Sequence, residues 1–253
     1  MKALKISALV LGLLVLGALT ILLVTAMKVP DQFMADFRAE TAKIKNNKVV
    51  LSYPDELLEK RTSLDARLAM SNDDSIGLRI NLKENQMYLE IQGIVLHKTP
   101  IIESKSSSFF KHLTVPEKYV LFHKPLSIQK SESNIEKDKF QEVIAPKDTI
   151  EAANIKEVIP DTVQTVPVLY RLYLDHGIRI EVVGKLNDTI PQFWPRFKFD
   201  YADRYLFLKS LTRSVLKKTP VPYQPTISIV ISSRDAESIY RAVPRNGNII
   251  LEF

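Results

Sequence analysis

Residues 77–93 read GLRINLKENQMYLEIQG, and this stretch determines the class of fold that we expect. Apolar and polar residues alternate over positions 77–82 and again over positions 87–91, and a polar run separates the two. A period of two is typical of strands that bury one face, and the polar run allows the chain to reverse between them. The pattern therefore predicts two antiparallel strands, and Gln92-Gly93 predicts a tight turn into a third strand.

Similar patterning extends towards the C-terminus, so residues 74–253 are predicted to form one domain that is mainly β with some α, an α+β fold. Residues 125–162 differ because they hold few aromatic and many charged residues, and we expect an insertion or long loop there. Further strands are expected at residues 119–122, 166–174, 178–183, 226–231 and 249–253, with helices at residues 203–218 and 235–243.

Residues 6–27 contain no charged side chain over 22 positions, from Ile6 through Leu16 to Met27. At about 1.5 Å per residue, a helix of this length matches a hydrocarbon core about 30 Å thick. The run is longer than the roughly 7–15 apolar residues of a secretory signal, so residues 1–28 are predicted to be a retained transmembrane anchor. Lysines before the run favour a cytoplasmic N-terminus. We therefore expect a single-pass protein of the bacterial inner membrane with its C-terminal domain in the periplasm.

Residues 29–73 are predicted to be a helical juxtamembrane stalk, with two helices that Asn46-Asn47 separates. In the second helix Leu57, Leu64 and Leu68 fall on one stripe, and charged residues cover the remaining surface. Such a stripe suits either a partner helix or the chain's own domain, and the sequence leaves both alternatives open.

The composition excludes several classes of site and function. The chain has no cysteine, which excludes disulfides, thiolate metal sites and a cysteine nucleophile. The net charge is +6, and subtracting the three lysines that flank the apolar run leaves +3, well below what a nucleic-acid-binding face carries. The four histidines lack the spacing of a metal site, and no glycine-rich nucleotide motif occurs, so we expect neither a metal nor a cofactor.

Two stretches resemble the catalytic domain of the L,D-transpeptidase family. That family begins with a Leu-rich strand, a turn and a Tyr-containing strand, and residues 77–93 follow this outline. It ends with a Ser-x-x-Asp-Ala helix that carries Tyr and Val-Pro before a Gly, and residues 232–247, SSRDAESIYRAVPRNG, fit closely. With a strand pair between them, the two stretches cover most of residues 75–253. The resemblance implies a β-rich extracytoplasmic domain related to peptidoglycan-modifying enzymes.

The catalytic positions of that family do not match this chain. The nucleophilic cysteine falls on Ser228, the arginine of its motif on Val230, and the His-Gly pair on Glu181-Val182. A serine hydroxyl needs a positioned base, and the sequence around Ser228 supplies none. The resemblance therefore implies a degenerate domain, and we predict that the chain is not an enzyme and has no transpeptidase activity.

Two further groups of residues are candidates for a site. Phe193, Trp194 and Arg196 belong to the densest aromatic cluster and form a candidate binding surface, because Trp and Arg are favoured at protein contacts. A role in the core or in anchoring a loop is the alternative. His176-Gly177 imitates the family's His-Gly pair at a displaced position, but Asp-His-Gly between two strands is also good turn chemistry.

Three functional hypotheses follow from these residues. In the first, the chain is a membrane-anchored scaffold whose degenerate domain docks other envelope or inner-membrane proteins as a structural subunit of an assembly. In the second, it is a pseudoenzyme that binds peptidoglycan by recognising stem peptides. In the third, it is an active enzyme with a rebuilt site, which requires His176 or another base within about 3.2 Å of the Ser228 hydroxyl.

Overall fold

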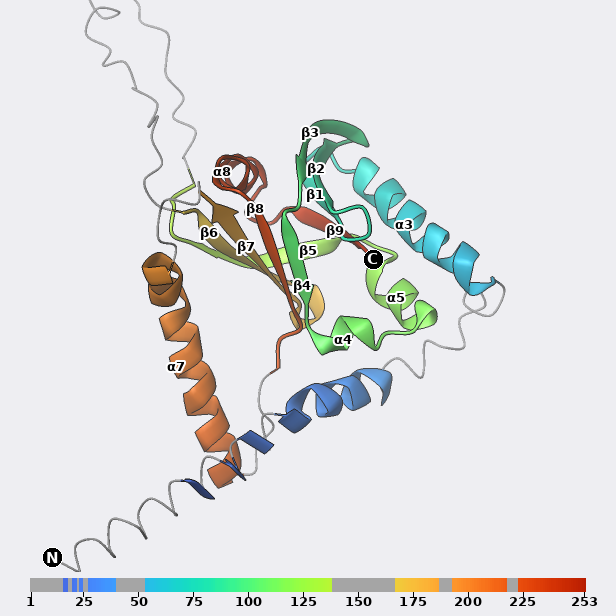
Figure 1. The fold of residues 1–253 in the computed structure, drawn as a ribbon. Coiled ribbons are helices and arrows are strands. Elements are labelled where there is room, and N and C mark those ends of the chain that lie inside the picture. Colours follow the sequence, from blue (N-terminus) through green and yellow to red (C-terminus); the bar gives the residue numbers. More distant parts are fainter. Residues whose placement is uncertain are drawn as a thin grey trace, which may run out of the picture.

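The computed structural model describes residues 16–17, 20–21, 23–24, 27–39, 53–137, 167–186, 193–217 and 223–253 (Figure 1). Within them, nine strands form one sheet in the order β3-β2-β1-β9-β5-β6-β7-β8-β4, with helices packed around it, which confirms the predicted α+β class. The strands are β1 (Gly77–Asn81), β2 (Gln86–Ile91), β3 (Ile94–Pro100), β4 (Glu103–Ser106), β5 (Leu126–Ser133), β6 (Leu169–Leu174), β7 (Arg179–Lys185), β8 (Thr226–Ser232) and β9 (Asn248–Glu252). The helices are α3 (Asp55–Ser71), α4 (Ser108–Lys111), α5 (Val115–Phe122), α7 (Phe193–Lys217), α8 (Ser233–Ala242) and the 3-10 turn η1 (Asp175–Gly177).

The two edge strands of this sheet, β3 and β4, are consecutive in the chain. The N–H of Ile101 donates to the carbonyl of Asn85 at 2.9 Å, next to β2. The N–H of Ile102 donates to the carbonyl of Val230 at 2.8 Å, on β8 at the other end of the strand order. The chain thus passes from one edge of the sheet to the other between neighbouring residues, so the sheet curls back on itself.

β8 shows how the curled sheet separates an inner from an outer face. Ile227, Ile229 and Ile231 are completely buried and belong to the main apolar core, together with residues of every other strand except the edge strands β3 and β4. Ser228 and Val230 alternate with them and are partly exposed. Because side chains alternate across a strand, Ser228 and Val230 lie on the outer face.

The residues predicted as a stalk include two helical segments that lie against the domain. In residues 27–39, Phe33 and Phe37 pack on Phe109 of α4, with ring centroids 5.3 and 5.6 Å apart. Arg38 of the same segment forms an ion pair of 3.0 Å with Glu117 of α5. The second segment, α3, packs against α5 and β9.

α3 buries a different stripe from the leucine stripe that its sequence suggests. Its buried residues recur every four positions, at Leu58, Thr62, Ala66 and Met70. Leu57, Leu64 and Leu68 lie on the opposite side and are 50–66% exposed, so the alternative in which this stripe packs on the chain's own domain is wrong. The small Thr62 and Ala66 allow the helix to approach its neighbours closely, and a count of large apolar residues overlooks them.

Residues 119–122 belong to the helix α5 and not to the predicted strand. The helix begins with a capping box, in which the carboxylate of Glu117 accepts the N–H of Thr114 at 2.8 Å, and Pro116 occupies its first turn. The apolar run Tyr-Val-Leu-Phe has no period of its own. The capping box that precedes this run favours a helix.

The expected insertion at residues 125–162 is also corrected at its start. Residues 126–133 form β5, which lies between β9 and β6 in the sheet. A bulge between Ile128 and Lys130 shifts the pairing of β5 with β6, so the alternation typical of a strand is broken in the sequence. Positions 138–162 of the expected insertion lie outside the described residues.

The predicted anchor lies largely outside the described residues, and Ile6 is among those not described. Leu16 and Met27 are described as helical, and both are exposed. Among the residues that the structure describes, no helix combines the length and the apolar character that crossing a membrane requires.

Candidate functional site

The outer face of the sheet brings together the positions at which the resemblance places catalysis. Glu181 of β7 and Ser228 of β8 are paired directly in the parallel register. The same row continues through Arg171 to Glu132 on one side and to Lys105 of β4 on the other. We call Glu132, Arg171, Glu181, Ser228 and Lys105 the polar row. It crosses five strands, and its charges alternate on the β5, β6 and β7 positions.

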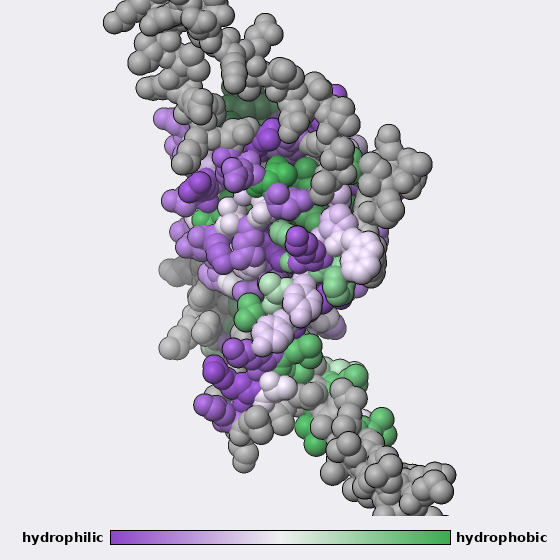
Figure 2. All heavy atoms as spheres, turned by 90° about the vertical axis from the view of Figure 1, so that its left-hand side faces the viewer, coloured by the Kyte–Doolittle hydropathy of each residue, from purple (hydrophilic) through white to green (hydrophobic). Residues whose placement is uncertain are grey.

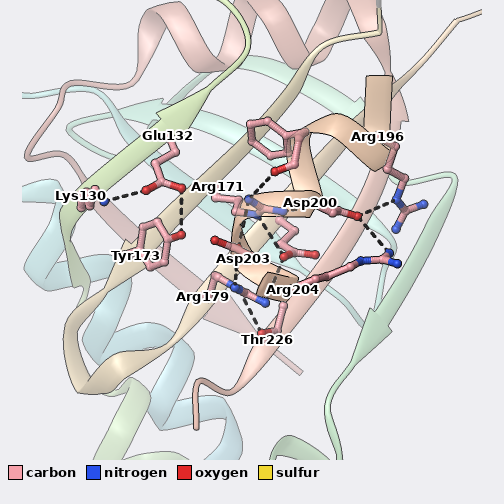
Figure 3. Close-up of polar contacts among 12 residues, drawn as sticks. Lys130, Glu132, Arg171, Tyr173, Arg179, Arg196, Asp200, Asp203, Arg204 and Thr226 are labelled. Carbon is pink, nitrogen blue, oxygen red and sulfur yellow. Dashed lines mark hydrogen bonds and ion pairs between the residues drawn. The ribbon is translucent and has the colours of Figure 1, made fainter. Parts of the chain in front are cut away.

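Arg171 is the centre of this face, with a side chain that is only 4% exposed (Figure 3). Its guanidinium contacts the carboxylates of Glu181 at 3.2 Å, Asp200 at 2.5 Å and Asp203 at 3.1 Å. It also donates to the carbonyl of Phe199 at 3.3 Å and lies 4.2 Å from the centre of that ring. Asp200, Asp203 and Phe199 all belong to α7, so Arg171 attaches this helix to the sheet.

Arg179 supplies the second positive charge that three carboxylates require. It contacts both Glu181 and Asp203 at 3.1 Å, and its Nε donates to the hydroxyl of Thr226 at 3.3 Å. A buried guanidinium is costly by itself, but here each charge has several directional partners. Sheet and helix therefore form one connected ion network, which Figure 3 shows between β6, β7, β8 and α7.

A smaller polar group extends the network towards β5. The hydroxyl of Tyr173 donates to Glu132 at 3.0 Å, and the ammonium of Lys130 donates to the same carboxylate at 2.6 Å. Burial, followed by the contact with Glu132, raises the pKa of Tyr173 to about 12. Burial would raise the pKa of Glu132, but Lys130 and Tyr173 hold it below its ordinary value. At neutral pH this tyrosine is therefore a hydrogen-bond donor.

Little space remains between α7 and the outer face. The hollow bounded by Arg171, Glu181, Arg196 and Asp200 measures about 10 Å³. A site for a drug-sized ligand usually encloses roughly 300–1,000 Å³. Among the described residues, the hollow beside Glu181 is thus far smaller than such a site.

The residues at the matched positions differ in chemistry from those of the family's motif. Among the polar contacts of the described residues, none joins Ser228 to a histidine. His176 lies in the 3-10 turn η1, with the positive backbone angle φ of 58° that a tight turn demands, and Gly177 follows at 70°. This confirms the turn prediction. Val230 is apolar where the family's motif has a guanidinium, and the neighbouring part of the outer face is the surface to which α7 is attached.

A second cluster combines Ser, His and Asp but has the wrong order for catalysis. The carboxylate of Asp235 accepts hydrogen bonds from Thr99 at 2.6 Å and Ser232 at 2.7 Å, and lies 3.2 Å from His97. In a catalytic triad the histidine lies between the other two groups, whereas here the aspartate does. Ser232 also accepts the N–H of Asp235 at 3.1 Å, so the cluster caps α8 and fastens it to β3. Burial would raise the pKa of Asp235, but these three donors hold it below its usual value.

Sequence reasoning missed His97 and Thr99 in this cluster. The only local signal is the Ser232-x-x-Asp235 spacing, which is typical of a helix cap. Nothing in the sequence indicates that a strand more than a hundred residues earlier reaches it. Within the described part of the chain, no group of three or more His, Cys, Asp or Glu side chains is arranged so that it could hold a metal ion.

The candidate binding surface is divided between two sides of α7. Trp194 is among the most exposed large side chains of the described residues. Arg196 is directed towards the sheet side, with its Nε 3.9 Å from Asp200, as Figure 3 shows. The side chain of Phe193 lies outside the description. α7 begins at Phe193, ten residues before the predicted helix, so the aromatic cluster is part of the helix.

Comparison with known proteins found no match among protein-family models, curated proteins or solved structures. The resemblance to L,D-transpeptidases therefore remains a hypothesis that rests on residues 77–93 and 232–247. The geometry of the outer face and of α7 stands independently of it.

Proposed function

We propose that this chain is a membrane-anchored docking protein of the bacterial envelope, built on an L,D-transpeptidase-like domain that performs no peptidoglycan chemistry. Residues 6–27 tether it in the inner membrane, the domain lies in the periplasm, and its partners are other envelope or inner-membrane proteins. One observation carries the proposal: where the resemblance places the catalytic residues, Glu181 is paired with Arg171 and Arg179 under α7, and the hollow measures about 10 Å³.

Opening this face for a substrate would require the ion network to separate. Lifting α7 would leave Arg171 buried against the sheet without Asp200 and Asp203. Removing one partner of a buried ion pair typically costs about 3–5 kcal/mol. A substrate could enter only after several such pairs had separated, and this cost would oppose turnover. A permanently attached helix suits a scaffold.

The outward stripe of α3 supports the docking part of the proposal. Leu57, Leu64 and Leu68 are exposed at spacings of seven and four, the pattern with which one helix meets another. Residues of both charges surround them, including the Glu56–Lys60 pair at 3.6 Å. The fitting partner is therefore an amphipathic helix of another envelope protein, with its own apolar stripe and mixed charges at the edges.

The second candidate function, peptidoglycan binding without chemistry, is favoured by a hollow on another part of the domain. This hollow measures about 640 Å³, and Lys137, Tyr240 and Arg245 are among the residues that line it. The Lys137 ammonium donates to the carbonyl of Val243 at 2.5 Å and lies 4.9 Å from the Tyr240 ring centre. Burial, followed by the nearby charge of Arg245, lowers the pKa of Lys137. Such an electropositive hollow suits the carboxylates of a stem peptide.

One experiment separates these two candidates from an enzyme. The full chain in mild detergent is incubated with isolated peptidoglycan sacculi, and after sedimentation the pellet and the released fragments are analysed by mass spectrometry. The docking protein stays in the supernatant and leaves the cross-links unchanged. Retention that the paired variant Lys137→Ala/Arg245→Ala abolishes would favour the peptidoglycan-binding candidate. New or cleaved cross-links that disappear in Ser228→Ala would refute the proposal.

The docking surface is tested with a photoreactive amino acid placed in α3 of the full chain in native membranes. At Leu64 we expect a discrete adduct with another protein after illumination, and at Thr62, which is buried in the same helix, we expect none. Leu68→Asp should remove the Leu64 adduct. Equal labelling at both positions, or no adduct at Leu64, would contradict a docking role for this stripe.

A further inference from the structure

The side of α7 that faces away from the sheet carries a continuous aromatic and aliphatic stripe. Trp194, Phe197, Tyr201, Tyr205 and Leu208 follow one another at spacings of three, four, four and three, and they are 39–70% exposed. The rings form a row, with centroids 6.0 Å apart for Trp194 and Phe197 and 6.1 Å apart for Phe197 and Tyr201. An apolar hollow of about 590 Å³ lies along the first two turns. We call these five residues the α7 stripe.

The ion network prevents α7 from turning this stripe inward. Asp200 and Asp203 bind Arg171 and Arg179 on the sheet side, and Leu211 and Ser214 are buried further along the helix. A surface helix normally buries its apolar side and exposes its charged side. α7 instead directs its two carboxylates towards the sheet. The ion pairs that attach the helix therefore keep the apolar stripe on the exposed side.

The charge on α7 indicates what covers the stripe. The helix contains six Lys or Arg residues and two Asp residues, and both Asp residues face the sheet. Lys198 and Lys209 lie within about 80° of the stripe centre on a helical projection, and no carboxylate of α7 does. In Figure 2, which views the side where α7 lies in Figure 1, pale and green side chains run along the surface with purple ones beside them. The complement is an apolar surface with negative charges at its edge.

The C-terminal half of α7 adjoins the segment that follows the apolar run. Leu211 of α7 and Val29 form a small buried cluster, against which Tyr223 packs. Val29 lies two residues after Met27, the last residue of the uncharged run. If residues 6–27 anchor the chain, this end of α7 lies next to the point where the chain leaves the membrane.

We propose that the α7 stripe lies in the headgroup region of an anionic lipid bilayer and fixes the domain on the membrane surface. Trp and Tyr favour the membrane interface, and flanking Lys and Arg attract anionic headgroups. The inference rests on the proposed membrane attachment and adds a second, lateral contact to it. A second copy of the chain is a poor occupant, because joining two such stripes would bring Lys198 and Lys209 of each copy against the other.

Trp194 allows a direct test, because it is the only tryptophan in the chain. The full chain is reconstituted into vesicles of phosphatidylcholine alone or with phosphatidylglycerol, so that the N-terminal run inserts in both. In the anionic vesicles we expect a blue-shifted Trp194 emission, quenching by brominated lipid, and an acrylamide quenching constant about threefold lower than in the neutral vesicles. High salt should reverse these changes.

Variants separate the stripe from a general attraction to lipid. The pair Lys198→Glu/Lys209→Glu should abolish the difference between the two vesicle types, and Tyr201→Ser/Tyr205→Ser should reduce it severalfold, with unchanged circular dichroism. The pair Lys60→Glu/Arg67→Glu on α3 is the matched control and should have no effect. Equal acrylamide quenching in both vesicle types at low salt would overturn the inference.

Two other outcomes also overturn it and identify a different occupant. Shielding of Trp194 that rises with the number of chains per vesicle would indicate a second copy. Shielding found in native membranes but absent from protein-free anionic vesicles would indicate a protein partner. Neither result alters the sacculus and α3 cross-linking tests, so failure here is distinguishable from failure of the proposed function.

Discussion

α3 and α7 lie at opposite ends of the domain in Figure 1, and they are attached to the sheet by different means. α3 packs through Leu58, Ala66 and Met70, an apolar seam. α7 is attached through Asp200 and Asp203, which bind a buried arginine. Each helix nevertheless turns an apolar stripe outward, so both have a surface that their own packing leaves exposed.

The surroundings of the two stripes differ as much as their attachments. α3 carries four acidic and three basic residues, and ion pairs such as Arg61–Asp65 at 3.2 Å neutralise much of its surface. α7 uses its only two carboxylates against the sheet, which leaves its outer surface basic. Mixed charge selects a protein helix, and uniform positive charge selects an anionic surface. The attachment of a helix thus determines which charges remain available to its partner.

Arg171→Ala should have the largest effect on stability, because it removes the ionic attachment of α7. It leaves Glu181, Asp200 and Asp203 without their central cation, and we expect a loss of about 3–5 kcal/mol in the free energy of unfolding. A urea titration of the full chain in mild detergent measures this loss.

The same variant separates the two helices by their order of proteolysis. α7 should be cleaved at lower protease concentrations than in the parent chain, whereas α3 should keep its protection. Arg204→Ala is the control, because the Arg204 side chain is two-thirds exposed and its contact with Asp200, at 3.4 Å, is longer than that of Arg171. It should cost less than about 1 kcal/mol. Simultaneous loss of both helices would show that they do not differ in attachment.

Leu58→Ala should have the next largest effect, on the apolar side of the comparison. Leu58 is completely buried against the domain, and truncating it removes contacts and leaves a cavity, at a cost of about 3 kcal/mol. Its neighbour Leu57 is half exposed, so Leu57→Ala should cost less than about 0.5 kcal/mol. The two variants test which side of α3 packs against the domain. Equal losses in the free energy of unfolding would mean that the leucine stripe also packs there.

The sequence predicts local structure well where one period or one turn motif dominates. The meander at residues 77–93 and the turn at His176 are correct for this reason. α5 and β5 are missed because a capping box and a bulge act on single residues and leave the hydrophobic pattern ambiguous. The leucine stripe of α3 does not identify the buried side of the helix, because that side includes the small residues Thr62 and Ala66.

The polar row shows a different limit of sequence reasoning. Arg171 and Glu181 are ten residues apart and share a hairpin, so their pairing is within reach of a pattern argument. Asp200 and Asp203 join them only because α7 folds back over β6 and β7. Scattered acids in a sequence carry no signal of such a shared partner, so the network becomes visible only in three dimensions.

Tyr173→Phe should change how the stability of the chain depends on pH. The pKa of Tyr173 is raised from 10.0 to about 12 in the folded chain. A raised pKa gives stability that is complete below pH 10 and is lost as the pH rises towards 12, because only the unfolded chain then ionises freely. Urea midpoints of the parent chain should therefore fall more steeply than those of Tyr173→Phe over this interval. Parallel curves would mean that the pKa of Tyr173 is not raised in the folded chain.

Leu64→Ser on α3 and Tyr201→Ser on α7 should have the smallest effects on stability, each below about 0.5 kcal/mol. Both residues are about 60% exposed and lie on the outward side of their helices, so folding gains little from them. Each substitution should nevertheless impair only the interaction of its own helix. Leu64→Ser should disrupt the α3 protein contact and leave Trp194 shielded on anionic vesicles, whereas Tyr201→Ser should do the opposite. If either variant impaired both readouts, the two stripes would belong to one continuous surface, and the contrast between an apolar and an ionic attachment would lose its functional meaning.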